Sequence, residues 1–135
     1  MEFVDTNYFL RYLLRDNENQ YQIARNLFED AILGKTPLFT STVVFFEIYW
    51  VLSTFYKKNK EEFLSILSDV LKMNYIKMDE RELLLEVLEI NKNQNLSLED
   101  CYNLVYSREN QASSFVTFDK KLLKFFGAEK KREEK

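Results

Sequence analysis

The sequence of 135 residues contains no histidine. This absence excludes Ser-His-Asp and Cys-His catalysis, acid–base catalysis by imidazole, and zinc sites with histidine ligands. The two glycines, Gly34 and Gly127, are too few for a G-x-G-x-x-G or Walker-type phosphate loop. If the chain is an enzyme, its chemical tools are therefore carboxylates, lysine, arginine, tyrosine, hydroxyl groups and a bound metal ion.

Other scarce features restrict the class of protein. A single cysteine, Cys101, excludes an internal disulfide framework and a C-x-x-C metal site. No apolar run reaches about 18 residues, so we expect no membrane span. Glu2 and Asp5 stand where a signal peptide would need basic and then apolar residues. We therefore expect a cytoplasmic protein.

The bulk composition is that of one globular domain. Hydrophobic residues make up 46% of the sequence and aromatic residues 16%, which is enough for a packed core. We expect a single domain over residues 1–128 and a charged, frayed tail over 129–135. The net charge of -3 excludes a chain that is basic throughout. Either a local basic rim or a solvated face would fit the scattered cations Arg11, Arg15, Lys57, Lys58, Lys60, Lys120, Lys121 and Lys124.

Predicted strands alternate with predicted helices along most of the chain. Strand patterns cover residues 1–4, 37–40, 75–78 and 114–118, with a weak signal for a fifth strand after Phe126. Helical patterns cover 6–15, 18–33, 42–56, 60–72, 80–91 and 97–110, and residues 119–126 suggest a turn or short helix. The alternation predicts an α/β fold with a small parallel sheet of four or five strands and helices on both faces.

The apolar stretch VVFFEIYWVL, residues 43–52, contains one carboxylate, Glu47. Its helical neighbours Val43, Val44, Trp50 and Val51 are apolar, and no lysine or arginine lies within one turn. The spacing therefore argues against a position for Glu47 on a solvent-exposed face of the helix. A buried carboxylate must be protonated, paired or bound to a metal. At this point a structural ion pair or a partly exposed side chain remains an alternative to a functional site.

Four acids fall at compatible positions of the predicted topology. Asp5 follows the first strand and Asp119 follows the fourth, while Glu47 lies in the helix after the second strand. Asp100 lies in the first turn of the helix that begins near Ser97. Ligands of open α/β sheets bind beyond the carboxyl ends of the strands, so we expect these acids to converge there. Close carboxylates repel one another unless a cation such as Mg²⁺ or Mn²⁺ neutralises them.

Each acid also has a purely structural explanation. Asp5 could cap the first helix, for which Thr6 or Asn7 is an alternative cap. Asp100 fits a capping box with Ser97, and Asp119 could begin a turn. The conjunction of four acids in one topology is what favours a metal site over these separate roles.

Four motifs, in order, resemble the PIN-domain family of metal-dependent ribonucleases, and most closely its VapC-type toxins. They are VDTNYFLRYLL with Asp5, STVVFFEIYWVL with Glu47, LSLEDCYNLVYS with Asp100, and FVTFDKKL with Asp119. The resemblance implies a metal-dependent endoribonuclease in which these four acids are catalytic and bind one or two Mg²⁺ or Mn²⁺ ions. It also implies that the hydroxyl groups of Thr6 and Thr117 orient them.

The same resemblance implies partners and leaves alternatives. A toxin of this family would act on RNA, form a homodimer and be silenced by a cognate antitoxin. A housekeeping PIN-type nuclease of RNA processing would share the site but have no antitoxin. A non-catalytic PIN-like binding domain would keep the fold and the acids without turnover. A phosphate-accepting receiver domain fits less well, because Asp5 has no adjacent second acid after the first strand.

Overall fold

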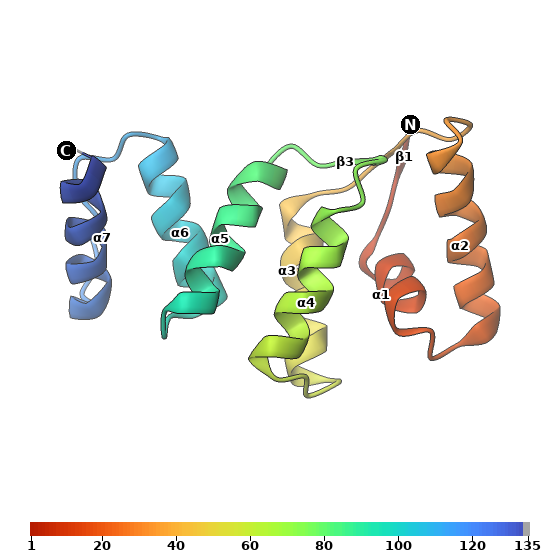
Figure 1. Ribbon diagram of the computed structural model, residues 1–135, viewed down its shortest axis with the longest axis horizontal. Coiled ribbons are helices and arrows are strands. Elements are labelled where there is room, and N and C mark those ends of the chain that lie inside the picture. The colour runs from red at the N-terminus through yellow and green to blue at the C-terminus, as the bar shows by residue number, and fades with distance from the viewer. Residues whose placement is uncertain (134–135) are drawn as a thin grey trace. The chain divides into compact units, whose positions relative to one another are not determined.

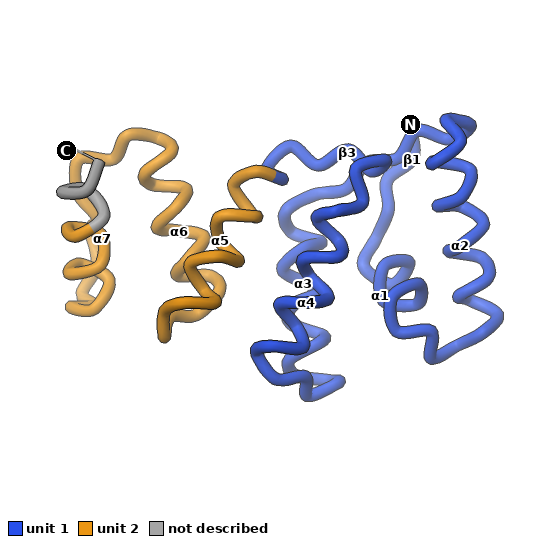
Figure 2. Tube along the Cα trace, in the orientation of Figure 1, with its two compact units in different colours: residues 1–81 blue, residues 82–135 orange. Residues whose placement is uncertain are grey.

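The structure, a computed structural model, describes residues 1–133, and the side chains of residues 1–128. The chain divides into two compact units, which Figure 2 shows in different colours. Unit 1 comprises residues 1–81 and unit 2 residues 82–135.

Unit 1 contains a parallel sheet of three short strands. They are β1 (Glu2–Phe3), β2 (Leu38–Phe39) and β3 (Ile76–Lys77), in the order β1-β2-β3. In the register of the sheet, Phe3 lies opposite Phe39 and Phe39 lies opposite Lys77. Two helices follow β1 and two follow β2, because a parallel strand can be reached only through a crossover connection. All three strands therefore end at the same edge of the sheet.

Four helices with polar caps complete unit 1. They are α1 (Thr6–Leu14), α2 (Glu18–Ile32), α3 (Thr42–Thr54) and α4 (Lys60–Leu71). Side-chain oxygens of Asp5, Asn17, Ser41 and Asn59 accept hydrogen bonds from their first turns. The cap of the first helix is thus Asp5, and the expectation of Thr6 or Asn7 was wrong. Helix α1 packs against α2 and α3, and α3 packs against α4 (Figure 1).

The core of unit 1 lies between the helices and one face of the sheet. Leu38 and Ile76 lie opposite each other in the register and are buried, whereas Phe3 and Phe39 on the alternate positions are exposed. The largest buried side chains of the helices are those of Phe9, Leu10, Phe28, Phe45, Ile48, Leu52, Leu67 and Leu71. Burial of this apolar area, at about 25 cal/mol per Å², is the main stabilising term for the helix packing.

A single arginine joins the end of α4 to β3. The Arg81 guanidinium donates to the carbonyl oxygens of Leu71 at 2.9 Å, Met73 at 3.0 Å and Ile76 at 2.6 Å. Leu71 is the last residue of α4, Met73 lies in the turn after it and Ile76 begins β3, and the helix dipole favours a cation at the end of α4. Arg81 therefore supplies a donor to the last carbonyl of α4 and ties it to the turn and to β3.

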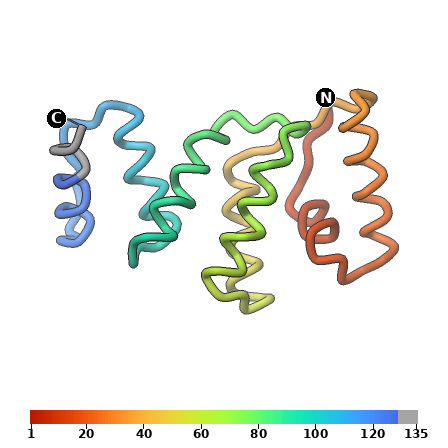
Figure 3. Tube along the Cα trace, in the orientation of Figure 1, coloured from red at the N-terminus to blue at the C-terminus, as the bar shows by residue number. Residues whose placement is uncertain are grey.

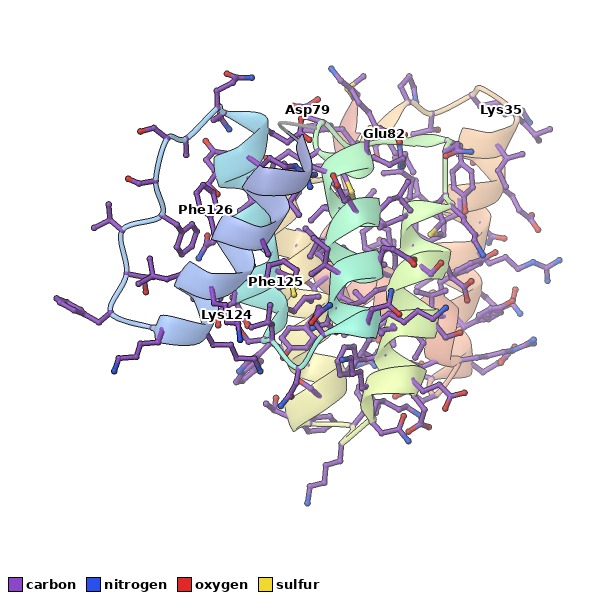
Figure 4. The ribbon with its side chains drawn as sticks, turned by 60° about the vertical axis from the view of Figure 1, so that its left-hand side comes forward. Lys35, Asp79, Glu82, Lys124, Phe125 and Phe126 are labelled. Carbon is purple, nitrogen blue, oxygen red and sulfur yellow. The ribbon has the colours of Figure 1, made fainter. Side chains whose placement is uncertain are left out.

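Unit 2 contains three successive helices, which Figure 3 traces along the chain: α5 (Arg81–Asn93), α6 (Leu98–Glu109) and α7 (Lys120–Glu133). Leu104, Leu122 and Phe126 form a buried apolar cluster. The ring of Phe115, in the loop before α7, lies 5.6 Å from that of Phe126 between their centroids. Figure 4 labels Phe126 on α7. The apolar side of α7 is thus anchored to α6 and to the preceding loop.

The prediction of an α/β fold with a parallel sheet is confirmed, but the number of strands was overestimated. The described residues form three strands, and neither 114–118 nor the segment after Phe126 is among them. Val116 is 96% and Phe118 106% exposed. An apolar, β-branched segment becomes a strand only where a neighbouring strand supplies hydrogen-bond partners. Here, 114–118 has no such partner among the described residues.

Helix α7 is longer than the turn or short helix expected for 119–126. The single domain over residues 1–128 and the frayed tail over 129–135 stay predictions. Helix α7 continues through residue 133, and residues 134 and 135 lie outside the described residues. None of the described helices is both long and apolar enough to cross a membrane.

Candidate active site

Asp5 lies between the end of β1 and the start of α1. Its backbone is extended, with φ -89° and ψ 170°, and its Oδ1 accepts a hydrogen bond of 2.8 Å from the backbone N–H of Thr6. The capping role that the sequence allowed is therefore confirmed. The side chain is exposed, and only Oδ1 takes part in the capping bond, so Oδ2 is left for a ligand.

Glu47 lies on the exposed face of α3. The prediction that this face is dry was wrong, because Val43 and Trp50, its neighbours on that face, are also exposed. The buried side of α3 is formed instead by Val44, Phe45, Ile48 and Leu52. In a helix that is apolar all round, neighbours three and four residues away cannot indicate which side faces water.

Thr6 connects the two acids of unit 1. Its backbone N–H donates to Asp5, and its hydroxyl donates to Oε2 of Glu47 at 2.6 Å. Thr6 itself is buried, so its rotamer is held by packing. A hydrogen bond from a packed hydroxyl to a carboxylate is short and strong, and fixes the direction of the carboxylate. The structure thus brings Asp5, Thr6 and Glu47 together, with one oxygen of each carboxylate left over.

The other predicted site residues belong to unit 2. Asp100 is half-buried in the first turn of α6, where its backbone N–H donates to Oγ of Ser97 at 3.1 Å. Asp119 is exposed and accepts a bond of 3.1 Å from the N–H of Leu122 at the start of α7. Thr117 accepts a bond from the backbone N–H of Asp119 at 3.1 Å, so it contacts the main chain of this acid.

The donor set of the paired acids suits a hard cation. Asp5 and Glu47 offer carboxylate oxygens, the ligands that Mg²⁺ and Mn²⁺ prefer, and Thr6 holds Glu47 as outer groups commonly hold metal ligands. Across the part of the chain that the structure describes, no three acidic or cysteine side chains are gathered closely enough to form a metal site by themselves. The pair of carboxylates that Thr6 joins would suit an Mg²⁺ ion that keeps several of its waters.

A further acid, Glu80, lies at the same edge of the sheet and was not singled out from the sequence. It follows β3 after a short turn, is half-buried, and accepts a bond of 2.6 Å from the hydroxyl of Thr42 at the start of α3. Its position after the strand pattern of 75–78 is the same signal that pointed to Asp5. The Thr42 bond ties the turn after β3 to the helix that carries Glu47.

Arg11, Arg15 and Lys58 are candidate cations that already form salt bridges within unit 1, Lys58 with Glu62 at 3.9 Å. Arg11 donates to Asp16 at 3.2 Å and to the hydroxyl of Tyr56 at 3.1 Å, and Arg15 donates to Glu18 at 3.1 Å. These contacts hold the turn between α1 and α2 against the end of α3. Arg11 and Arg15 therefore act as structural cations rather than as open phosphate ligands. Lys57 is exposed at the end of α3 and has no salt bridge to a described residue.

The same contacts shift the ionisation of the groups involved. The pKa of Asp16 is lowered, mainly because the Tyr56 hydroxyl donates to its carboxylate and also because Arg11 lies beside it. The pKa of Glu18 falls to about 2 through hydrogen bonds from Arg15 and then Gln22. Burial raises the pKa of Tyr75 to about 12. These groups keep their usual charges near neutral pH, so the network stays intact there.

Comparison with known protein families gives one match: the profile of the PIN domain aligns with residues 3–126. This range includes all four predicted acids and both predicted threonines. No curated protein and no solved structure matches the chain. Because the match covers far more than half of the sequence, the chain belongs to the PIN-domain family.

Proposed function

We propose that the protein is a metal-dependent endoribonuclease that hydrolyses phosphodiester bonds in RNA. PIN domains are generally nucleases, and the match over residues 3–126 is the observation that carries this proposal. The hydrogen bond from Thr6 to Glu47 supports it, since it orients a carboxylate beside Asp5 as a metal ligand would need.

In this proposal Asp5, Glu47, Asp100 and Asp119 hold one or two Mg²⁺ or Mn²⁺ ions. Such an ion, when bound, lowers the pKa of a water molecule and stabilises charge on the phosphate. The residues of the chain have simpler tasks. The carboxylates would bind the ion, the Thr6 hydroxyl fixes the orientation of the Glu47 carboxylate, and the Thr117 hydroxyl accepts a hydrogen bond from the backbone N–H of Asp119.

The proposed role is that of a cytoplasmic toxin in a toxin–antitoxin pair, acting as a homodimer and silenced by an antitoxin protein. The resemblance of the four motifs to VapC-type toxins supports this role, although a housekeeping RNA-processing nuclease would share the same site. A gene for a small DNA-binding protein, overlapping the upstream end of this one, would favour the toxin. Growth arrest on expression of the wild type, but not of Asp5→Asn, would favour it further.

The test of the activity is cleavage of a mixed RNA pool by purified protein with Mg²⁺ or Mn²⁺, and then with EDTA. Asp5→Asn is the informative variant, because asparagine caps a helix as well as aspartate does and the fold is kept. Asp69→Asn, at an exposed position of α4, is a matched control for the loss of one charge.

Cleavage that needs both the metal and Asp5, and that survives Asp69→Asn, is the expected result. Cleavage that persists in EDTA would overturn the metal-dependent mechanism. A folded protein, free of antitoxin, that cuts no RNA in either metal would favour the non-catalytic binding domain instead.

A further inference from the structure

One face of α3 carries exposed apolar side chains on both sides of Glu47. Val43, Glu47, Trp50 and Thr54 are spaced by four, three and four residues, so they form a single stripe along the helix. All four are exposed, and the exposed fractions of Val43 and Trp50 are 66% and 63%. An aromatic side chain thus stands in water one turn away from the acid that Thr6 orients.

Trp50 lacks the ring contacts that Phe3 and Phe55, two other exposed aromatic residues of unit 1, make. Tyr8 of α1, which is 38% exposed, lacks such contacts as well. The exposed Phe3 pairs with Phe39 at 5.3 Å between ring centroids, and the exposed Phe55 pairs with Tyr56 at 5.1 Å. The indole of Trp50 makes no ring contact and no hydrogen bond with any described residue. Its flat surface is therefore open for a ligand.

We propose that Trp50 is a substrate-binding residue, on which a base of the RNA stacks next to the phosphodiester bond that is cut. This inference rests on the proposed function. Residues three apart on a helix have Cβ atoms about 5–6 Å apart, which places the indole beside the Glu47 carboxylate. Base–aromatic stacking needs only a free π-face, and such stacking is how single-stranded nucleic acid is bound without regard to sequence.

The exposed Glu47 carboxylate argues against a second copy of the chain as the occupant of this stripe. A protein surface that covered Val43 and Trp50 would also remove water from Glu47, which has no salt bridge to a described residue. Burying a carboxylate without a cation is costly. A base that stacks on Trp50 leaves the carboxylate in contact with water or with the metal. Lys57, beyond the end of the same helix, adds an exposed cation for the backbone.

The experiment uses the intrinsic fluorescence of Trp50, which is the only tryptophan in the sequence. Asp5→Asn protein in EDTA is titrated with an oligoadenylate of about ten nucleotides, within the usual site size for single strands. The control ligand is an abasic ribose-phosphate chain of the same length and charge. Saturable quenching by the oligoadenylate alone is expected. Equal changes with both ligands, or no saturable change, would overturn the proposal.

Variants separate stacking from other roles of the surface. Trp50→Ala should raise the Kd of labelled oligoadenylate about tenfold, the loss expected for one stacked base, while Trp50→Phe should stay close to the wild type. Phe55→Ala is the matched control, because Phe55 is 75% exposed but lies about 140° around the helix from Trp50. It should leave the Kd unchanged. A Trp50→Ala protein that loses self-association in sedimentation, with an unchanged Kd, would refute the proposal.

The outcomes for this surface and for the activity are independent. Quenching in EDTA requires no turnover, so it can occur even if the RNA pool is never cut. Cleavage without quenching would support the nuclease activity and exclude Trp50 as a substrate-binding residue. In an active enzyme, Trp50→Ala should raise KM about tenfold and leave kcat within about twofold, because a residue that binds substrate and transition state equally affects KM.

Discussion

Replacing Thr6 by valine tests the contact on which the candidate site is built. Valine has nearly the same shape, so the buried position stays filled while the hydroxyl that donates to Glu47 at 2.6 Å is lost. A hydrogen bond to a charged group contributes about 1.5–3 kcal/mol when it is shielded from water. Because the Glu47 side chain is exposed, we expect the lower part of this range or less, about 1 kcal/mol.

The assay is a double-mutant cycle of Thr6→Val and Glu47→Ala, measured by urea unfolding in EDTA with Trp50 emission as the signal. Each single variant removes the bond, so the expected coupling free energy is about 1 kcal/mol, and Thr6→Val should lower the melting temperature by about 4 °C. A coupling of about 0.3 kcal/mol or less lies within the usual additivity of independent sites. That result would mean that the hydroxyl does not hold Glu47 in solution.

The functional arm of the same test uses RNA cleavage. If Thr6 orients a metal ligand, Thr6→Val should reduce activity by about 10–100-fold, which is the usual loss when a residue that hydrogen-bonds to a metal ligand is replaced. Thr6→Ser keeps a hydroxyl at the same atom position and should restore most of the activity. Activity that is lost in both variants alike would point to a packing defect rather than to the hydrogen bond.

Three further predictions concern the frame around the site. Arg81→Met should lower the free energy of unfolding by about 3 kcal/mol in a urea titration, because three main-chain acceptors lose a charged donor; a loss below about 1 kcal/mol would contradict this. On α3, Ile48→Ala should cost about 3 kcal/mol and the exposed Val43→Ala at most about 0.5 kcal/mol in the same titration, and equal losses would disprove the assignment of its faces. Asp16 has a lowered pKa in the fold, so its contribution is present above the unfolded value of 3.8 and is lost as the pH falls through the lower folded value. Tyr56→Phe should therefore be less stable than the wild type at neutral pH, and the difference in melting temperature should narrow as the pH falls below about 4, whereas a difference of unchanged size in acid would exclude the Asp16 contact as a contributor.

Local sequence patterns were sufficient to predict the helices and the parallel arrangement of the strands. The expected bounds of the helix from 18 to 33 differ from α2 by one residue at its end, and Gly34 follows it with φ +77°, a backbone conformation that glycine adopts readily. Ser41, directly before α3, caps this helix through its side-chain oxygen. Such features depend on residues within one turn of each other, so the sequence contains them. The crossover rule for strands that alternate with helices then determines a parallel sheet.

The exposed side of α3 was decided by tertiary packing alone. Every side of this helix is apolar, so its sequence cannot tell that Ile48 faces the core while Glu47 and Trp50 face water. The pairing of Glu47 with Thr6 joins residues 41 positions apart, and only the packing of α1 on α3 creates it. Tertiary packing also decided the state of residues 114–118. Their sequence favours a strand, but no strand within the described chain pairs with them. The sequence thus singled out the candidate acids, whereas the structure decided which of them meet, because contacts between distant segments depend on packing that no local pattern encodes.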